Sequence, residues 1–253
     1  MGQIIGLAYA GAHQATPGMH IPIRVEGGTM VHAKVVQLPF HDPDNLRQEL
    51  CAMTSLQAEA FVPRSPRAEL LHTCALTDLT DVARVGFRGG DSAAYLQQRG
   101  YRLPQQPNQA ARQDDGGWVA RLSQTEYLLL GSLADESARV AAAEAEWVQD
   151  AQRNYLLPRQ DSHAWLQLSG VHGSAVMAKL CGVDLRAEAF PVGAVAQTSA
   201  ARINVIVVNV GSDERPALQL LFDRASLAYL REAMLDAMDE FDGGLIGLGE
   251  LLG

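Results

Sequence analysis

The sequence has little cysteine and no excess of positive charge. Its 253 residues include three cysteines, Cys51, Cys74 and Cys181, with no Cys-x-x-Cys spacing. An odd number of unclustered cysteines argues against a disulfide framework or a cysteine-rich zinc site, and we expect reduced thiols in a cytoplasmic protein. The formal net charge of −9 argues against nucleic acid or an anionic membrane as the main partner.

Long apolar segments are also absent. No uncharged apolar run approaches the roughly 18 residues that a membrane-spanning helix needs. The N-terminal MGQIIGLAYAGAH carries no basic residue ahead of its short apolar stretch, so it does not resemble a signal peptide. We therefore expect no membrane partner.

Common catalytic and metal-binding signatures are missing as well. Gly89-Gly90 is not followed by the Gly-Lys-Ser/Thr ending of a phosphate loop, and no Gly-x-Ser-x-Gly occurs. His20 and His32 are candidates to meet across a hairpin, but a metal site needs a third ligand at a suitable spacing. We expect no metal site, and we expect Cys181 to be a buried structural cysteine at a helix end.

The composition is that of a globular protein, with 47% hydrophobic and 19% charged residues. Its length allows one large domain or two modest ones. Near the N-terminus, the segments 4–9, 21–25 and 30–38 favour short strands, separated by glycine-containing turns. Three strands are too few for a closed barrel, so we expect this β unit to pack on something else.

One order of elements occurs twice in the remainder of the chain. A strand, a glycine and a helix are followed by two or more strands and a second, longer helix. The strand-to-helix junctions VGFRGGDSAAYLQQ (85–98) and LQLSGVHGSAVMAK (166–179) align with each other. Short helices are predicted over 92–98, with Asp91 as N-cap, and over 173–181, and the longer helices over 135–152 and 226–241. Strands are predicted over 195–198, 203–210 and 217–222. This repetition predicts an α+β fold of two similar modules about a pseudo-twofold axis.

Four segments carry a resemblance to a known superfamily. DLTDVARVGFRGGDSAAYLQQ (78–98) and HAWLQLSGVHGSAVMAKLCGVDL (163–185) resemble two strand-helix units of the folate-binding region of aminomethyltransferases, the class of the glycine-cleavage T-protein. VDLRAEAFPVGAVAQTSA (183–200) and SQTEYLLLG (123–131) are most similar to the gamma subunit of heterotetrameric sarcosine oxidase. The resemblance implies two folate-binding-type modules preceded by a small β-barrel-like fragment.

The segment 4–48 resembles the C-terminal barrel module of the same superfamily, which here precedes the folate-type modules. A fusion and a gene start inside a longer reading frame both explain this order. The expected organisation is a barrel-like β fragment at 1–50, a linker at 51–76 and a gamma-subunit-like domain at 77–253, divided into modules 77–160 and 161–253.

Two sites that the aminomethyltransferase resemblance implies lack their catalytic groups. No aspartate follows the Gly116-Gly117 turn, where active family members carry the acid that activates folate. We expect Asp114 and Asp115, which precede the turn, to be solvated turn residues. The family's pterin-contacting loop is missing near Glu214, which we expect at a solvent-facing hairpin tip. We therefore predict no catalytic residue on this chain and assign no cofactor-binding residue.

The gamma-subunit resemblance implies a non-catalytic subunit of a heteromeric, sarcosine-oxidase-like complex that oxidises secondary or tertiary methylamines. It places FAD, FMN and NAD on larger flavoprotein partner subunits and no cofactor on this chain. Two alternatives stay open. One is a stand-alone folate-dependent aminomethyltransferase or demethylase, which would bind tetrahydrofolate. The other is a folate-binding accessory factor for iron–sulfur proteins.

Overall fold

The computed structural model describes residues 16–24, 30–36 and 69–251, and the predicted strand over 4–9 lies outside them. The chain divides into two compact units, Met1–Phe61 and Val62–Gly253. None of the helices in the described ranges combines the length and apolarity needed to cross a membrane.

In the first unit, the described residues form one antiparallel hairpin of β1 (His20–Arg24) and β2 (Met30–Lys34). Ile23 pairs with Val31 and Ile21 with Ala33, so these side chains share one face. Ile23 and Val31 are 40% and 39% exposed. A lone two-stranded hairpin is marginally stable in water, and the described part of this unit offers no core against its aliphatic face.

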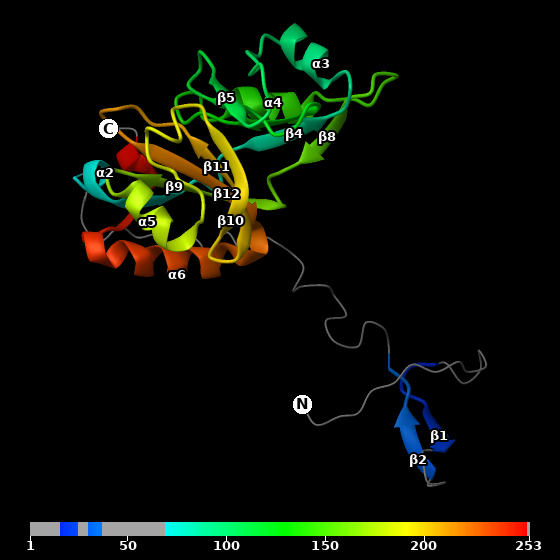
Figure 1. The fold of residues 1–253 in the computed structure, drawn as a ribbon. Helices are drawn as coiled ribbons and strands as arrows, with labels where there is room; N and C mark the ends of the chain where they lie inside the picture. The colour runs from blue at the N-terminus through cyan, green and yellow to red at the C-terminus, as the bar shows by residue number, and fades with distance from the viewer. Residues whose placement is uncertain (1–15, 25–29, 37–68, 252–253) are drawn as a thin grey trace. The chain divides into compact units, whose positions relative to one another are not determined.

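The second unit alternates strands and helices (Figure 1). Its first half contains α2 (Leu70–Thr73), β3 (Ala75–Asp78), β4 (Arg84–Arg88), α3 (Ser92–Gln98), β5 (Gln109–Arg112), β6 (Trp118–Arg121), β7 (Glu126–Leu130), α4 (Ala138–Ala145) and β8 (Tyr155–Pro158). Its second half contains β9 (His163–Ser169), α5 (Gly173–Leu180), β10 (Val195–Ala200), β11 (Ile203–Asn209), β12 (Ala217–Asp223), α6 (Leu227–Met238) and β13 (Gly244–Ile246). Short 3-10 turns, η2 (Arg224–Ser226), η3 (Asp239–Phe241) and η4 (Leu248–Leu251), flank α6 and follow β13.

These strands form two sheets with corresponding strand orders. One sheet runs β5-β6-β7-β4-β8 and the other β10-β11-β12-β9-β3-β13. In each, a three-stranded meander lies beside the strand that precedes it in the chain, with one helix before the meander and one after it. The predicted α+β class is confirmed.

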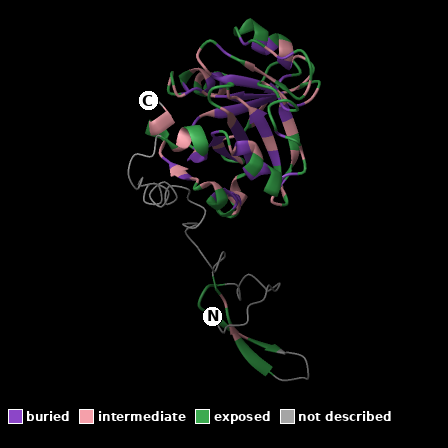
Figure 2. Cartoon of the chain, turned by 60° about the vertical axis from the view of Figure 1, so that its left-hand side comes forward, coloured by how far each residue is buried: buried purple, intermediate pink, exposed green. Residues whose placement is uncertain are grey.

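Side chains alternate between separate cores along the strands. Leu166 and Leu168 of β9 pack in a core with α5 and α6, whereas Trp165 points into the core that β6 and β7 share. Likewise Leu129 of β7 packs in the core that includes α3 and α4, and Leu128 packs in the shared one. The sheets therefore pack face to face, with helices on both outer surfaces, and Figure 2 shows buried residues along them.

A buried arginine, Arg84, forms hydrogen bonds to both segments that connect one sheet to the other. Arg84 is 0% exposed and donates hydrogen bonds to the backbone carbonyls of Thr80, Val82, Gln160 and His163. The Thr80 and Val82 carbonyls lie in the β3–β4 loop, and the others lie at the β8–β9 junction. One guanidinium thus ties together the two crossings from one sheet to the other.

Three predicted details differ in the structure. Leu70–Thr73 and Ala75–Asp78 are elements of the second unit, although the sequence places most of them in a linker. The helix predicted over 135–152 spans only Ala138–Ala145, and Val148, beyond its end, is 76% exposed. Asp91 occupies the N-cap of α3, but its carboxylate accepts hydrogen bonds from Arg153 instead of capping the helix.

Candidate functional site

A cavity of about 420 Å³ opens at one end of the core shared by the two sheets. We call it the inter-sheet cavity. Trp118 of β6 contributes to it from one sheet, and Trp165, Gln167 and Gln219 contribute from β9 and β12 of the other. Loops complete the wall, including the turn before β6, the segment after β7 and the turn between β11 and β12.

The inter-sheet cavity brings together the two regions in which the sequence lacks family residues. Gly116, from the turn after Asp115, lines it, and so does Arg215, next to Glu214. Gly116 has φ +88°, a conformation that favours glycine. Glu214 is exposed in the β11–β12 turn, where the sequence places it, and is not part of the lining.

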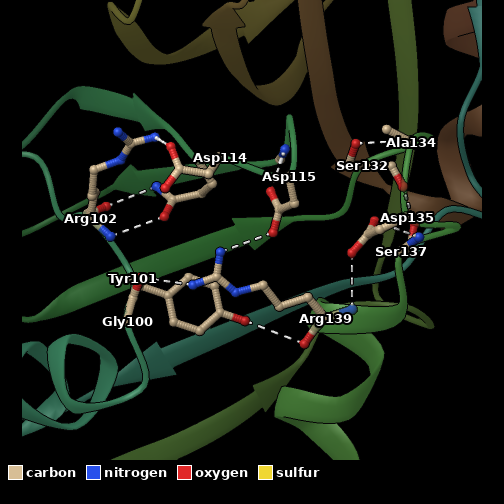
Figure 3. Close-up of polar contacts among 12 residues, drawn as sticks. Gly100, Tyr101, Arg102, Asp114, Asp115, Ser132, Ala134, Asp135, Ser137 and Arg139 are labelled. Atoms are coloured by element: carbon tan, nitrogen blue, oxygen red, sulfur yellow. Dashed lines mark hydrogen bonds and ion pairs between the residues drawn. The ribbon is translucent and has the colours of Figure 1, made fainter.

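The two aspartates before the Gly116-Gly117 turn have different environments. The side chain of Asp114 is 91% exposed and pairs with Arg102 at 2.7 Å, in keeping with a solvated turn residue. The expectation is wrong for Asp115, whose side chain is 19% exposed and pairs with Arg139 at 3.0 Å. Figure 3 shows this pair, and the Asp115 carboxylate also accepts a hydrogen bond from the Gly117 N–H. Asp115 therefore holds the turn against α4.

Two glutamine amides, those of Gln167 on β9 and Gln219 on β12, form the polar inner surface of the cavity, which we call its floor. Gln219 donates to Gln167 Oε1 at 3.1 Å, and Gln167 donates to Ser169 Oγ at 3.1 Å. The strand register places Gln219, Gln167 and Thr77 side by side on one face. These residues are not among the sites predicted from the sequence. The sequence feature that points to them is a polar residue between two leucines: each glutamine lies in a Leu-Gln-Leu triplet within a segment that is otherwise typical of a buried strand.

Several buried polar atoms of this floor have no hydrogen-bond partner among the described residues. They are Trp165 Nε1, Gln219 Oε1 and Thr77 Oγ1. Trp165 is 1% exposed and Gln219 is 7% exposed. Each unsatisfied buried polar group lowers the free energy of unfolding by about 1–3 kcal/mol. These polar side chains therefore destabilise the fold relative to apolar side chains of similar size.

The lining contains no side chain suited to proton transfer. Its polar side chains are the guanidinium groups of Arg112 and Arg215, the serine hydroxyls, the two amides and the two indoles. Among the described residues, no carboxylate, imidazole, amine or thiol lines it. General acid–base chemistry needs such a group within hydrogen-bond reach of the substrate. The described lining is therefore suited to binding a ligand.

The remaining candidate residues lie outside the inter-sheet cavity. Cys181 is buried at the C-cap of α5, as expected of a structural cysteine. His20 and His32 lie on β1 and β2 of the first unit. Within the described ranges, no three His, Cys, Asp or Glu side chains are grouped closely enough to hold a metal ion. Burial raises the pKa of the Cys74 thiol, against a smaller opposing effect of Lys179.

The chain is similar to proteins of two related kinds, although no protein-family profile matches it. It is 28% identical over 204 residues to sarcosine oxidase subunit gamma of Corynebacterium sp. (strain P-1), covering 75% of this chain and 97% of that protein. A chain of the heterotetrameric sarcosine oxidase of Corynebacterium sp. U-96, solved with pyrrole 2-carboxylate, superposes with a TM-score of 0.56 at 21% identity. That match covers 76% of this chain and 94% of the other.

The glycine cleavage system aminomethyltransferase T of Bartonella henselae superposes with the same TM-score of 0.56 at 14% identity. This match covers 78% of the chain and 59% of the aminomethyltransferase. The predicted resemblance is confirmed: the chain is a homologue of the sarcosine oxidase gamma subunits and has the fold of the aminomethyltransferases.

Proposed function

We propose that this chain is a non-catalytic subunit of a heteromeric, sarcosine-oxidase-like complex that oxidises secondary or tertiary methylamines in the cytoplasm. The observation that carries the proposal is the gamma-subunit relative, which the chain matches over 97% of its length. A match of that extent covers a whole subunit rather than one shared module.

The chemistry of the inter-sheet cavity supports the non-catalytic part of the proposal. Within the described part of the chain, its lining has arginine, serine, glutamine and tryptophan but no acid or histidine. Removing a central general acid or base lowers a rate by about 10²- to 10⁴-fold. A stand-alone aminomethyltransferase or demethylase is therefore disfavoured, and no residue of the described chain favours the iron–sulfur accessory role.

The exposed hairpin supports assembly with partners. The aliphatic side chains of Ile21, Ile23, Val31 and Ala33 share one face of β1 and β2, and the described residues of that unit do not cover it. Apolar surface left in water weakens the folded state by about 25 cal/mol per Å². A partner subunit that covers this face would stabilise the hairpin.

In this proposal the redox cofactors belong to the partners. The larger flavoprotein subunits carry FAD and FMN and use NAD, and this chain carries none of them. The proposed role of the chain is to complete and stabilise that assembly.

Affinity purification of the tagged full chain from its native host tests the proposal. Mass spectrometry and the visible spectrum of the eluate identify the partners and their flavin. We expect larger subunits in fixed ratio with flavin absorption, whereas recovery of a lone monomer under mild conditions contradicts the proposal.

Matched variants of the hairpin test how assembly occurs. Ile23→Ser and Val31→Ser change the aliphatic face, and Lys34→Ser changes the opposite face of the same hairpin. We expect the first two to reduce recovery of the partners and the third to leave it unchanged. Equal recovery with all three variants would show that this face does not contribute to assembly.

A further inference from the structure

The rim of the inter-sheet cavity carries two positive charges that the described chain does not neutralise. Arg112 lies on β5 and Arg215 in the turn before β12, and both line the cavity. Neither guanidinium makes an ion pair or a side-chain hydrogen bond with another described residue. By contrast, Arg102, Arg139 and Arg186 each have an aspartate partner.

No acidic side chain of the described residues lines the cavity with these two arginines. This part of the lining has no aspartate or glutamate, although acidic residues outnumber basic ones in the chain as a whole. Asp213 and Glu214, which precede the lining Arg215, and Glu250, which precedes the lining Leu251, are all outside the lining. Glu250 Oε2 is buried without a hydrogen-bond partner among the described residues. Charges of one sign around a low-dielectric cleft attract ions of the opposite sign, so the rim favours an anion.

The interior suits an organic body. Trp118 and Trp165 present indole rings, and Leu79 and Val82 add aliphatic surface. Trp165 Nε1 is an unpaired donor and Gln219 Oε1 an unpaired acceptor, in side chains at least nine-tenths buried. The volume of about 420 Å³ lies within the range of small-molecule sites, roughly 300–1,000 Å³.

We propose that the inter-sheet cavity binds a small aromatic carboxylate. The carboxylate lies at the rim with Arg112 and Arg215, where guanidinium groups match its planar geometry. The ring lies toward Trp118 and Trp165, and polar atoms on the ring meet the unpaired donor and acceptor of the floor. Binding is non-covalent, because the lining has no nucleophile of enhanced reactivity and no acid or base. This site is independent of the proposed subunit role.

Titration of the full chain with benzoate and indole-2-carboxylate tests the site, with benzamide as the uncharged analogue of benzoate. Calorimetry gives the affinities. Tryptophan fluorescence in a Trp147→Phe background reports from the cavity, because the two remaining tryptophans, Trp118 and Trp165, both line it. We expect saturable binding of both carboxylates and about tenfold weaker binding of benzamide.

Three single substitutions test whether the two rim arginines bind the carboxylate of the ligand. Arg112→Gln and Arg215→Gln should each weaken benzoate binding by about threefold to tenfold, because each removes one charged hydrogen-bond donor. Arg215→Lys should retain part of the lost affinity. Arg202→Gln is the matched control, because Arg202 is exposed and lies outside the lining; we expect unchanged affinity.

Any of four results overturns the proposal. These are no saturable binding of either carboxylate, equal affinity for benzamide and benzoate, unchanged affinity in both glutamine variants of the rim, and tighter binding of inorganic phosphate than of the carboxylates. The four variants change three exposed arginines, Arg112, Arg202 and Arg215, and circular dichroism spectra verify that each variant is folded.

Discussion

Arg84 is a fully buried cation with no carboxylate bound to it among the described residues. Its two terminal nitrogens donate instead to backbone carbonyls from two connections, three of them at 2.9 Å, whereas Nε has no partner among the described residues. Burial lowers its pKa to about 10, with a further contribution from Arg224. It remains charged at neutral pH and replaces the water that these carbonyls would otherwise bind.

Replacing Arg84 with methionine should lower the free energy of unfolding by about 3 kcal/mol, because several carbonyls lose their donor. Lysine should also destabilise, since a single ammonium cannot reproduce the planar fork. Urea denaturation measures both. The control Arg102→Met removes an exposed pair with Asp114 and should cost at most about 1 kcal/mol. Equal losses for the two methionine variants would contradict this account.

His163 is a half-buried group whose charge also affects stability. Burial, together with the nearby guanidinium groups of Arg159 and Arg84, lowers its pKa to about 4, against a smaller opposing effect of Asp223. Its ring Nδ1 lies 2.8 Å from Ser162 Oγ. The folded protein therefore keeps this imidazole neutral under conditions in which the unfolded chain protonates it.

This difference predicts a loss of stability as pH falls. Below about pH 6.5 the unfolded state binds a proton that the folded state does not, so stability declines from pH 6.5 toward pH 4. We expect a decrease of about 1–2 kcal/mol between pH 7 and pH 5. Asp184, whose pKa Arg186 lowers to about 2, titrates below this window.

His163→Gln should flatten the decline, as urea denaturation at several pH values measures. Substituting the exposed His72 should leave it unchanged. A slope that persists in His163→Gln would assign the pH dependence to other groups.

The elements that the sequence predicts well are those with strong local patterns. The helix over Ser92–Gln98 matches its prediction residue for residue. The strands β11 and β12 also match within two residues, because their nearly continuous apolar runs reflect burial on both faces. These local patterns are enough to predict that a segment is a helix or a strand, but they do not predict which other strands it pairs with.

The missed elements depend on distant neighbours. Ala75–Asp78 is a strand because it pairs with Ser169 on one side and Gly244 on the other, residues about 100 and 170 positions away. The three residues of β13 are too few for a local signal. For the same reason the sequence locates the Gly116 and Glu214 regions but not the cavity floor, since Gln167 and Gln219 become neighbours only through strand register.

The attachment of α4 to the Gly116-Gly117 turn gives a prediction at the scale of elements. Arg139, on the first turn of the helix, pairs with Asp115, donates to the Gly100 carbonyl and lies 4.1 Å from the ring centroid of Tyr101. These partners come from the α3–β5 loop and the β5–β6 turn. Both groups are largely shielded from solvent, which strengthens the pair.

A double-mutant cycle with Asp115→Asn and Arg139→Gln should give a coupling free energy of about 1 kcal/mol. The control cycle, Asp114→Asn with Arg102→Gln, joins atoms at 2.7 Å but in side chains that are 91% and 58% exposed. It should couple by no more than about 0.3 kcal/mol. Equal couplings would mean that distance, and not shielding, sets the strength of these pairs.

At the scale of the whole molecule, the three hydrophobic cores of the described chain all lie within the second unit. Every buried residue of these cores falls between Cys74 and Met238. The described hairpin of the first unit contributes no side chain to any of them. The stability of the second unit should therefore be independent of the first.

A chain that begins at Val62, the first residue of the second unit, should unfold in one cooperative transition. Its midpoint should lie within about 2 °C of the corresponding transition of the full chain, because no core contact is removed. Calorimetry and far-ultraviolet circular dichroism measure both transitions. A fall of more than about 5 °C, or loss of cooperativity, would mean that residues before Val62 contribute to the fold of the second unit. If the truncated chain keeps its midpoint but no longer captures larger subunits, the first unit serves assembly rather than folding.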